Sequence, residues 1–193
     1  MAKKHKLLLT VLVVGLGGTL AGFGVFAAFS NTTSNTGNTF QAGSVSISDN
    51  DSDAALFNNT LHANAMPGDY DRCIRVTYAG TLDAAVKLYT SAITGSGNDL
   101  NVTIDKSDTG TDVDCSDFGT AVGSTITNVF AAAPLTTLDN HANWSNGLAV
   151  TPIGATEWVQ NNAVTFRFRI TVADGDQSKT VNSFGVTWEA QNQ

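Results

Sequence analysis

The sequence is poor in positive charge and in charged residues generally. Its 193 residues include 10 lysines and arginines against 17 aspartates and glutamates, a formal net charge of −7. Such a chain repels nucleic acid and anionic membrane surfaces, so we expect neither as a partner. Residues that favour long helices, such as Glu, Lys, Gln and Arg, are scarce, whereas Gly, Asn, Thr, Ser and Asp are plentiful. This composition favours short strands joined by polar turns, as in an all-β protein.

The sequence also lacks the motifs of several common active sites. None of its three histidines belongs to an HExxH pattern, which places two zinc ligands and a general base on one helix. No glycine-rich nucleotide loop and no Ser-His-Asp order is present either. We therefore expect no catalytic residues and no cofactor.

The most apolar run lies at the N-terminus. Residues 2–6 read AKKHK, and Leu7–Phe29 carries no charge and has small residues at Ala27 and Ala28. A basic start, a short apolar core and a small-residue exit are typical of a secretory signal peptide, here residues 1–27. We expect cleavage between Ala27 and Ala28. A retained membrane anchor is the alternative, because an uncharged run of this length can span a bilayer.

The mature chain then begins with a polar segment, residues 28–39. Lys3, Lys4 and Lys6 leave with the signal peptide, so the net charge changes from −7 to −10. The segment consists mainly of Asn, Thr, Ser and Gly, and Phe29 is its one bulky residue. Such a segment cannot form a core, so we expect it to be mobile in a free subunit.

From residue 40 onward the pattern changes to alternating apolar and polar residues. The clearest strand is AVTFRFRITVA, in which five apolar residues from Val164 to Val172 fill one face. Further strands are predicted over residues 39–48, 73–80, 84–91, 99–105 and 181–191. Residues 124–138 have a briefly helical pattern that Pro134 interrupts. Seven or eight short strands, with one or two short helical segments, predict an antiparallel β-sandwich at residues 40–193.

Cys73 and Cys115 are the only cysteines. In an exported chain a single pair predicts a disulfide. This disulfide would close a loop of 42 residues and contribute about 4 kcal/mol by the loop-entropy relation. Two buried thiols are the alternative, and a metal site is disfavoured because no CxxC spacing exists.

Asp49, Asp51 and Asp53 stand at alternate positions in SDNDSDAALFNNT. This spacing begins an EF-hand loop, but the sixth and twelfth places are Ala54 and Thr60 where the motif requires Gly and Glu. An EF-hand is therefore excluded. A solvated acidic turn is favoured over a loose surface calcium site.

Three stretches of the sequence resemble the TasA/camelysin family of secreted fibre proteins. They are FAAFSNTTSNTGNTFQAGSVSISDND, MPGDYDRCIRVTYAG and the closing FGVTWEAQ. Residues 95–160 carry no diagnostic motif. The resemblance implies a jelly-roll sandwich, export through the Sec route and trimming by a signal peptidase of the SipW type. It also implies assembly into extracellular fibres of a biofilm matrix, with other copies of the chain and other matrix components as partners.

In such fibres the freed N-terminal segment of one subunit pairs as a strand with the next subunit. Mapped here, this donor segment is residues 28–39, which begin with Ala28, Phe29, Ser30, Asn31, Thr32 and Thr33. Twelve extended residues reach about 40 Å, and the segment contains no proline, so its amides can join a ladder. We therefore expect a secreted or cell-surface protein that contacts the membrane only before processing.

The same family has been described as containing metallo-endopeptidases, so a secreted zinc metallo-endopeptidase is the alternative function. His62 and His141 both lie in predicted loops, in LHANAMPG and DNHANWSN. They would have to bind zinc together with distant aspartates, and no spacing in the sequence indicates such a site. We therefore expect a structural protein rather than an enzyme.

Overall fold

The structure is a computed structural model, and it describes residues 43–51, 54–57, 66–95, 99–176 and 181–192. All of these residues belong to one unit, Ala42–Gln193. The predicted signal peptide and donor segment, together with Asp53 and His62, lie outside the described residues. The predictions made for them remain predictions.

Strands dominate the described part of the chain, as the composition predicts. They are β1 (Ile47–Asp49), β2 (Gly68–Tyr78), β3 (Ala84–Thr90), β4 (Thr94–Gly95), β5 (Asn101–Ser107), β6 (Ile126–Pro134), β7 (Leu148–Val150), β8 (Ala163–Val172), β9 (Val181–Ser183) and β10 (Val186–Asn192). A short 3-10 helix, η1 (Leu135–His141), connects β6 to β7.

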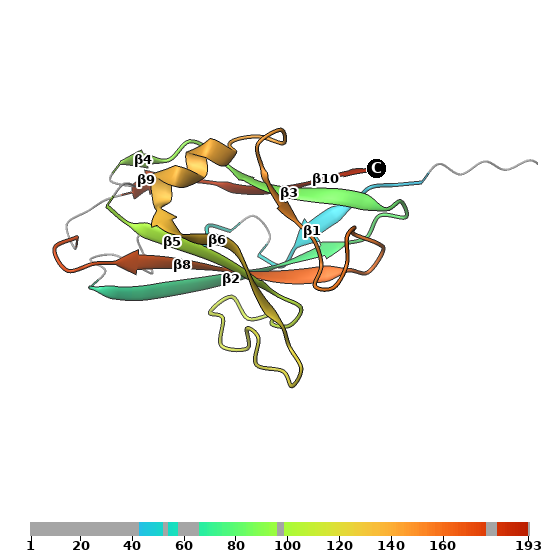
Figure 1. The fold of residues 1–193 in the computed structure, drawn as a ribbon, viewed down its shortest axis with the longest axis horizontal. Coiled ribbons are helices and arrows are strands. Elements are labelled where there is room, and N and C mark those ends of the chain that lie inside the picture. The colour runs from blue at the N-terminus through green and yellow to red at the C-terminus, as the bar shows by residue number, and fades with distance from the viewer. Residues whose placement is uncertain (1–42, 52–53, 58–65, 96–98, 177–180, 193) are drawn as a thin grey trace, which may run out of the picture. The chain divides into compact units, whose positions relative to one another are not determined.

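The strands form two main sheets that pack face to face (Figure 1). One has five strands in the order β1-β2-β8-β5-β6, and the other has three in the order β10-β3-β7. The short pair β4-β9 continues the ribbon of β3 and β10 beyond its end. All these pairings are antiparallel. The predicted antiparallel β-sandwich is therefore confirmed.

The core lies between the two sheets. The predicted inward face of β8 is confirmed, because its alternate residues from Val164 to Val172 are all buried. Helix η1 adds Leu135 and Leu138, and the indole Nε1 of the buried Trp158 donates to the Val150 carbonyl at 2.8 Å. The fully buried large side chains are Trp158, Tyr78, Phe166, Phe168, Leu88, Ile104, Leu135, Leu138, Val76, Val86, Val102 and Val150.

The helical segment predicted at residues 124–138 is wrong over most of its length. Residues 126–134 form β6, which pairs with β5, and η1 begins only at Leu135. The run Ala131–Ala133 favours a helix locally, but that preference is small beside a ladder of hydrogen bonds along β5. Pro134 precedes the helix, a position at which its missing amide costs nothing.

The predicted strand at residues 39–48 is also corrected. Among its described residues only Ile47 and Ser48 are in β1, and residues 43–46 join no ladder. Ser44 bonds instead to the turn after β2, where the amides of Thr81 and Leu82 donate to its carbonyl. Competing turn hydrogen bonds therefore shorten this strand.

The last predicted strand, at residues 181–191, is two strands in the structure. β9 pairs with β4, and β10 pairs with β3. The chain steps from one to the other at Gly185, whose amide donates to the Ser91 hydroxyl at 2.7 Å. Phe184, Val186 and Trp188 pack against the core.

Candidate functional site

Two long strands lack a hydrogen-bonded strand on one side within the described ranges. β6 pairs only with β5, and β10 pairs only with β3. An edge strand presents unpaired amide and carbonyl groups, to which another extended segment can add. The edges of β6 and β10 are therefore the candidate sites for strand addition.

The edge of β6 is irregular. Its register with β5 shifts twice, around Ile104. The side-chain amide of Asn128 donates to Asp105 Oδ1 at 3.0 Å and to the Phe130 carbonyl of its own strand at 3.1 Å. Bulges of this kind bend and twist an edge and so discourage pairing with a further strand.

The edge of β10 is regular. Its pairing with β3 runs without a shift from Val186 opposite Thr90 to Asn192 opposite Ala84. Polar contacts on the outer face hold this register, because the Tyr89 hydroxyl donates to Glu189 Oε2 at 2.8 Å. The same hydrogen bond is the largest cause that raises the pKa of Tyr89. β10 is thus the better template for an added strand.

The core is incompletely covered beside β10. Val186, Trp188 and Ala190 pack against the core but remain only partly buried. The Trp188 ring lies 5.4 Å from Phe166 and 6.0 Å from Phe168, measured between ring centroids. Its Nε1 is inaccessible and has no hydrogen-bond partner in the described part of the chain. A buried donor without an acceptor costs stability, so this end of the core is not fully satisfied.

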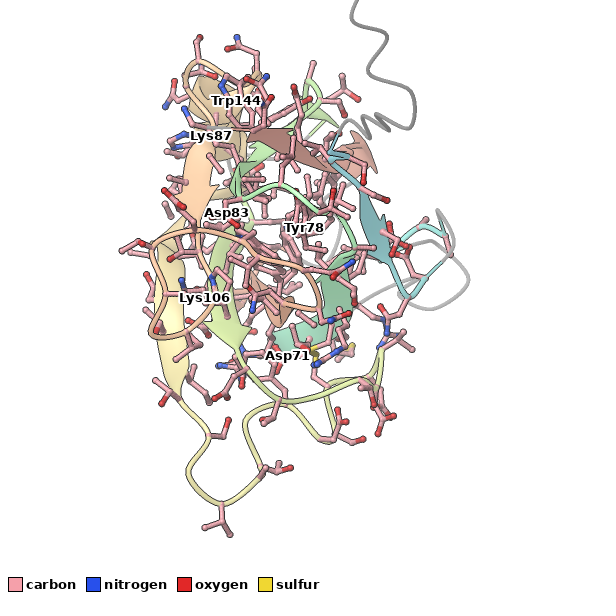
Figure 2. All side chains as sticks on the ribbon, turned by 90° about the vertical axis from the view of Figure 1, so that its right-hand side faces the viewer. Asp71, Tyr78, Asp83, Lys87, Lys106 and Trp144 are labelled. Atoms are coloured by element: carbon pink, nitrogen blue, oxygen red, sulfur yellow. A yellow bond between two sulfur atoms is a disulfide. The ribbon has the colours of Figure 1, made fainter. Side chains whose placement is uncertain are left out.

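The outer face of β3 carries a second polar contact. Lys87 Nζ donates to the Trp144 carbonyl at 2.9 Å and lies 5.2 Å from the centroid of the indole ring. Figure 2 shows these two side chains together near the top of the view. The contact ties the loop after η1 to the three-stranded sheet.

Cys73 and Cys115 form a disulfide, with their Cα atoms 5.1 Å apart. Cys73 lies on β2, and Cys115 lies in the segment 108–125 between β5 and β6, here called the disulfide loop. The Cys73 amide also donates to the Val113 carbonyl at 3.0 Å. Phe118 covers the Arg167 guanidinium, with 4.7 Å between the Arg167 Cζ and the ring centroid. The loop is therefore fixed against the outer face of the five-stranded sheet.

The strand residues under and around this loop form a network of ion pairs. Arg167 Nη2 lies 2.6 Å from Asp105 Oδ2, and Arg169 binds both oxygens of Asp71 at 2.7 and 2.8 Å. The Asp71 hydrogen bond is the largest cause that raises the pKa of Arg169. These charges stabilise the sheet face and are already paired.

The predicted calcium ligands are placed only in part. Asp49 ends β1, and the Asp51 amide in the following bend donates to Asp49 Oδ1 at 3.2 Å. Asp53 lies outside the described residues. In the ranges that the structure describes, no three His, Cys, Asp or Glu side chains are grouped so that they could hold a metal ion.

His141, the last residue of η1, is used locally. Its Nδ1 lies 2.6 Å from the Asn146 carbonyl, and its ring meets the Phe130 ring edge-on, with 6.0 Å between centroids. No described side chain completes a zinc site around it.

The edge of β10 could not be found from the sequence alone. The alternation of Val186 and Trp188 indicates a strand, but which strands end a sheet depends on the order of strands in space. The only sequence signal is the position of this strand near the end of the chain.

A family profile matches most of the chain. No curated protein matches the chain, and no helix in the described ranges is long and apolar enough to cross a membrane. The family profile described as camelysin metallo-endopeptidase matches residues 2–146, which is well over half of the chain. This match includes the predicted signal peptide, the donor segment and every element from β1 to η1. The chain therefore belongs to the camelysin metallo-endopeptidase family.

Proposed function

We propose that the mature protein is an extracellular structural subunit that assembles into matrix fibres. A signal peptidase of the SipW type cuts between Ala27 and Ala28, and the freed residues 28–39 pair as a strand with the next subunit. The observation that supports this function is the regular edge of β10, which forms no ladder with a second strand among the described residues.

A donated strand fits this edge for three physical reasons. It would satisfy the unpaired main-chain groups of β10, which place no demand on side chains, so the donor can be polar. It would cover the half-buried apolar side chains beside Trp188 and so remove apolar surface from water. Phe29, the one bulky donor residue, would anchor the strand against the core.

This contact joins different surfaces of two identical subunits, so it propagates into a filament and need not close into a ring. A net charge of −10 after cleavage opposes such association. Backbone pairing and apolar contact must overcome that repulsion.

The family description also implies a metal-dependent peptidase, which is the other candidate. The described residues do not fit a metal of that kind, because His141 has no further ligands around it. We therefore derive no step through a metal, and we propose a structural role rather than a catalytic one.

The test compares matched variants of the secreted mature protein by electron microscopy. Wild type should form fibres, and a chain that lacks residues 28–38 should remain folded and soluble without forming them. Thr32→Pro with Thr33→Pro removes two ladder amides and should also stop assembly, whereas Thr32→Ser with Thr33→Ser should not. An excess of the peptide 28–39 should cap growing fibres.

Two results would contradict the proposed function. In the first, the truncated chain polymerises as well as the mature chain. In the second, dispersed wild-type monomers cleave a protein substrate and lose that activity with a chelator, which favours the peptidase.

A further inference from the structure

We infer that the end of the sandwich from which the donor segment emerges is a contact surface for a second copy of this chain. The surface consists of Val45, Leu82 and Val159 on segments 43–46, 79–83 and 157–162, and is here called the entry surface. The second copy is the one that receives the donated strand, so the inference rests on the function proposed above.

Hydrogen bonds hold the first two of these segments together. The amides of Thr81 and Leu82 donate to the Ser44 carbonyl at 2.8 and 3.2 Å. In return, the Ser44 amide donates to Thr81 Oγ1 at 2.9 Å. The chain therefore enters the described fold clamped to the turn between β2 and β3.

The third segment joins the same end through Tyr78, the last residue of β2. The Asn161 amide donates to the Tyr78 carbonyl at 2.9 Å, and the Tyr78 amide donates to the Asn162 carbonyl at 2.8 Å. Trp158 pairs with Ala84, the first residue of β3. Figure 2 looks onto this end, with Tyr78 and Asp83 near the centre of the view.

Each segment exposes one large apolar side chain. Val45 is 38% exposed, Leu82 is 39% exposed and Val159 is 44% exposed. Leu82 also lies against Gly43, where an added Cβ would meet the Leu82 Cδ2 at 2.3 Å. A single exposed apolar residue needs no explanation. Three exposed apolar side chains at the end where the chain enters the domain offer apolar surface that a neighbouring molecule can cover.

The length of the tether places the neighbour against this surface. Only residues 40–42 separate the donor segment from Gly43. Thr39 can therefore lie at most about 14 Å from Gly43, and two packed layers of sheet are themselves about 10 Å apart. A subunit that holds the donor segment as far as Thr39 must then touch the end from which the segment leaves.

The entry surface also carries exposed carboxylates, at Asp83 and Glu157, and its three segments contain no Lys or Arg. A neighbour with a net charge of −10 is repelled by them. Contact at this surface should therefore strengthen as salt screens the repulsion.

The experiment compares the same substitution at two exposed valines, one on the entry surface and one on the disulfide loop. Val159→Asp introduces a charge on the entry surface, and Val122→Asp introduces the same charge on the fully exposed tip of the disulfide loop. Val159→Asp should raise the critical concentration for fibre formation at least tenfold, or about 1.4 kcal/mol, and Val122→Asp should leave it unchanged. Val45→Ser is the milder second variant, and circular dichroism with thermal melting checks that each protein is folded.

A photo-crosslinking amino acid at position 159 or 122 gives a readout that does not require fibres. Wild-type chains should crosslink to one another from position 159, more strongly at higher salt, and not from position 122. Fibres that form normally with Val159→Asp and Val45→Ser, with no crosslink from 159, would overturn the entry surface and leave strand donation standing. Crosslinks from 159 without any fibres would support the surface and count against the proposed function.

Discussion

Removing the disulfide gives the sharpest test of how this fold is stabilised. Cys73 and Cys115 are separated by 42 residues, and closing a loop of that length lowers the entropy of the unfolded chain by an amount worth about 4 kcal/mol at 25 °C. Cys73 is 1% exposed, so alanine at both positions leaves a small cavity as well. We therefore expect Cys73→Ala with Cys115→Ala to lose about 4 kcal/mol of unfolding free energy.

Urea unfolding followed by tryptophan fluorescence measures this loss. At a slope of about 2 kcal/mol per M, the midpoint should fall by about 2 M. Reduced wild type is the control that keeps both side chains, and its midpoint should lie near that of the double variant. Phe118→Ala, with the disulfide intact, tests the loop contact alone. A loss below about 1 kcal/mol in both the variant and the reduced protein would refute the loop-entropy reasoning.

Three further predictions follow from single residues. Gly80→Ala places a Cβ 2.3 Å from Tyr78 Oη and 2.7 Å from the Ser44 carbonyl, so it should cost about 1–3 kcal/mol in a urea titration. The pKa of Asp117 is lowered mainly by the hydrogen bond from the Asp112 amide and further by Thr111. The stability that the Asp117 carboxylate contributes is therefore complete above pH 3.8, the ordinary pKa of this group. It is lost as the pH falls through the lower pKa of the folded state. Asp117→Asn should weaken the fold at pH 7 and flatten the acid limb of the stability profile. Mass spectrometry of exported protein should find Ala28 as the first residue, and an intact Met1 would contradict this.

The strands with the strongest alternation could be predicted from the sequence, and the reason is burial on one face. In β8 the residues from Val164 to Val172 alternate with Thr and Arg, so only one face can enter a core. On β2 and β8 this alternation predicts burial of the inner face only. Cys73 and Thr165 point to the outer face and are still buried, because the disulfide loop covers that face. Strand periodicity carries no information about a loop that folds back over a sheet.

The remaining differences come from tertiary pairing. Residues 126–134 have the composition of a weak helix, and only the presence of β5 beside them makes them a strand. The candidate site shares this origin, since the β10 edge exists only through the order of strands in the three-stranded sheet. The disulfide, by contrast, was predictable because two cysteines in a chain with a predicted signal peptide leave one pairing.

The pairing of Asn192 with Ala84 brings the last residues of β10 beside the turn at residues 79–83, where Thr81 and Leu82 bond to Ser44. Cargo fused after β10 would therefore emerge beside the entry surface, where it would obstruct the next subunit. The tip of the disulfide loop offers a better position, because Val122 is fully exposed and a Cβ added at Gly123 would meet no atom within 4 Å. In a fibre of the kind proposed above, an affinity tag or enzyme inserted there would lie on the side and leave the growing ends accessible.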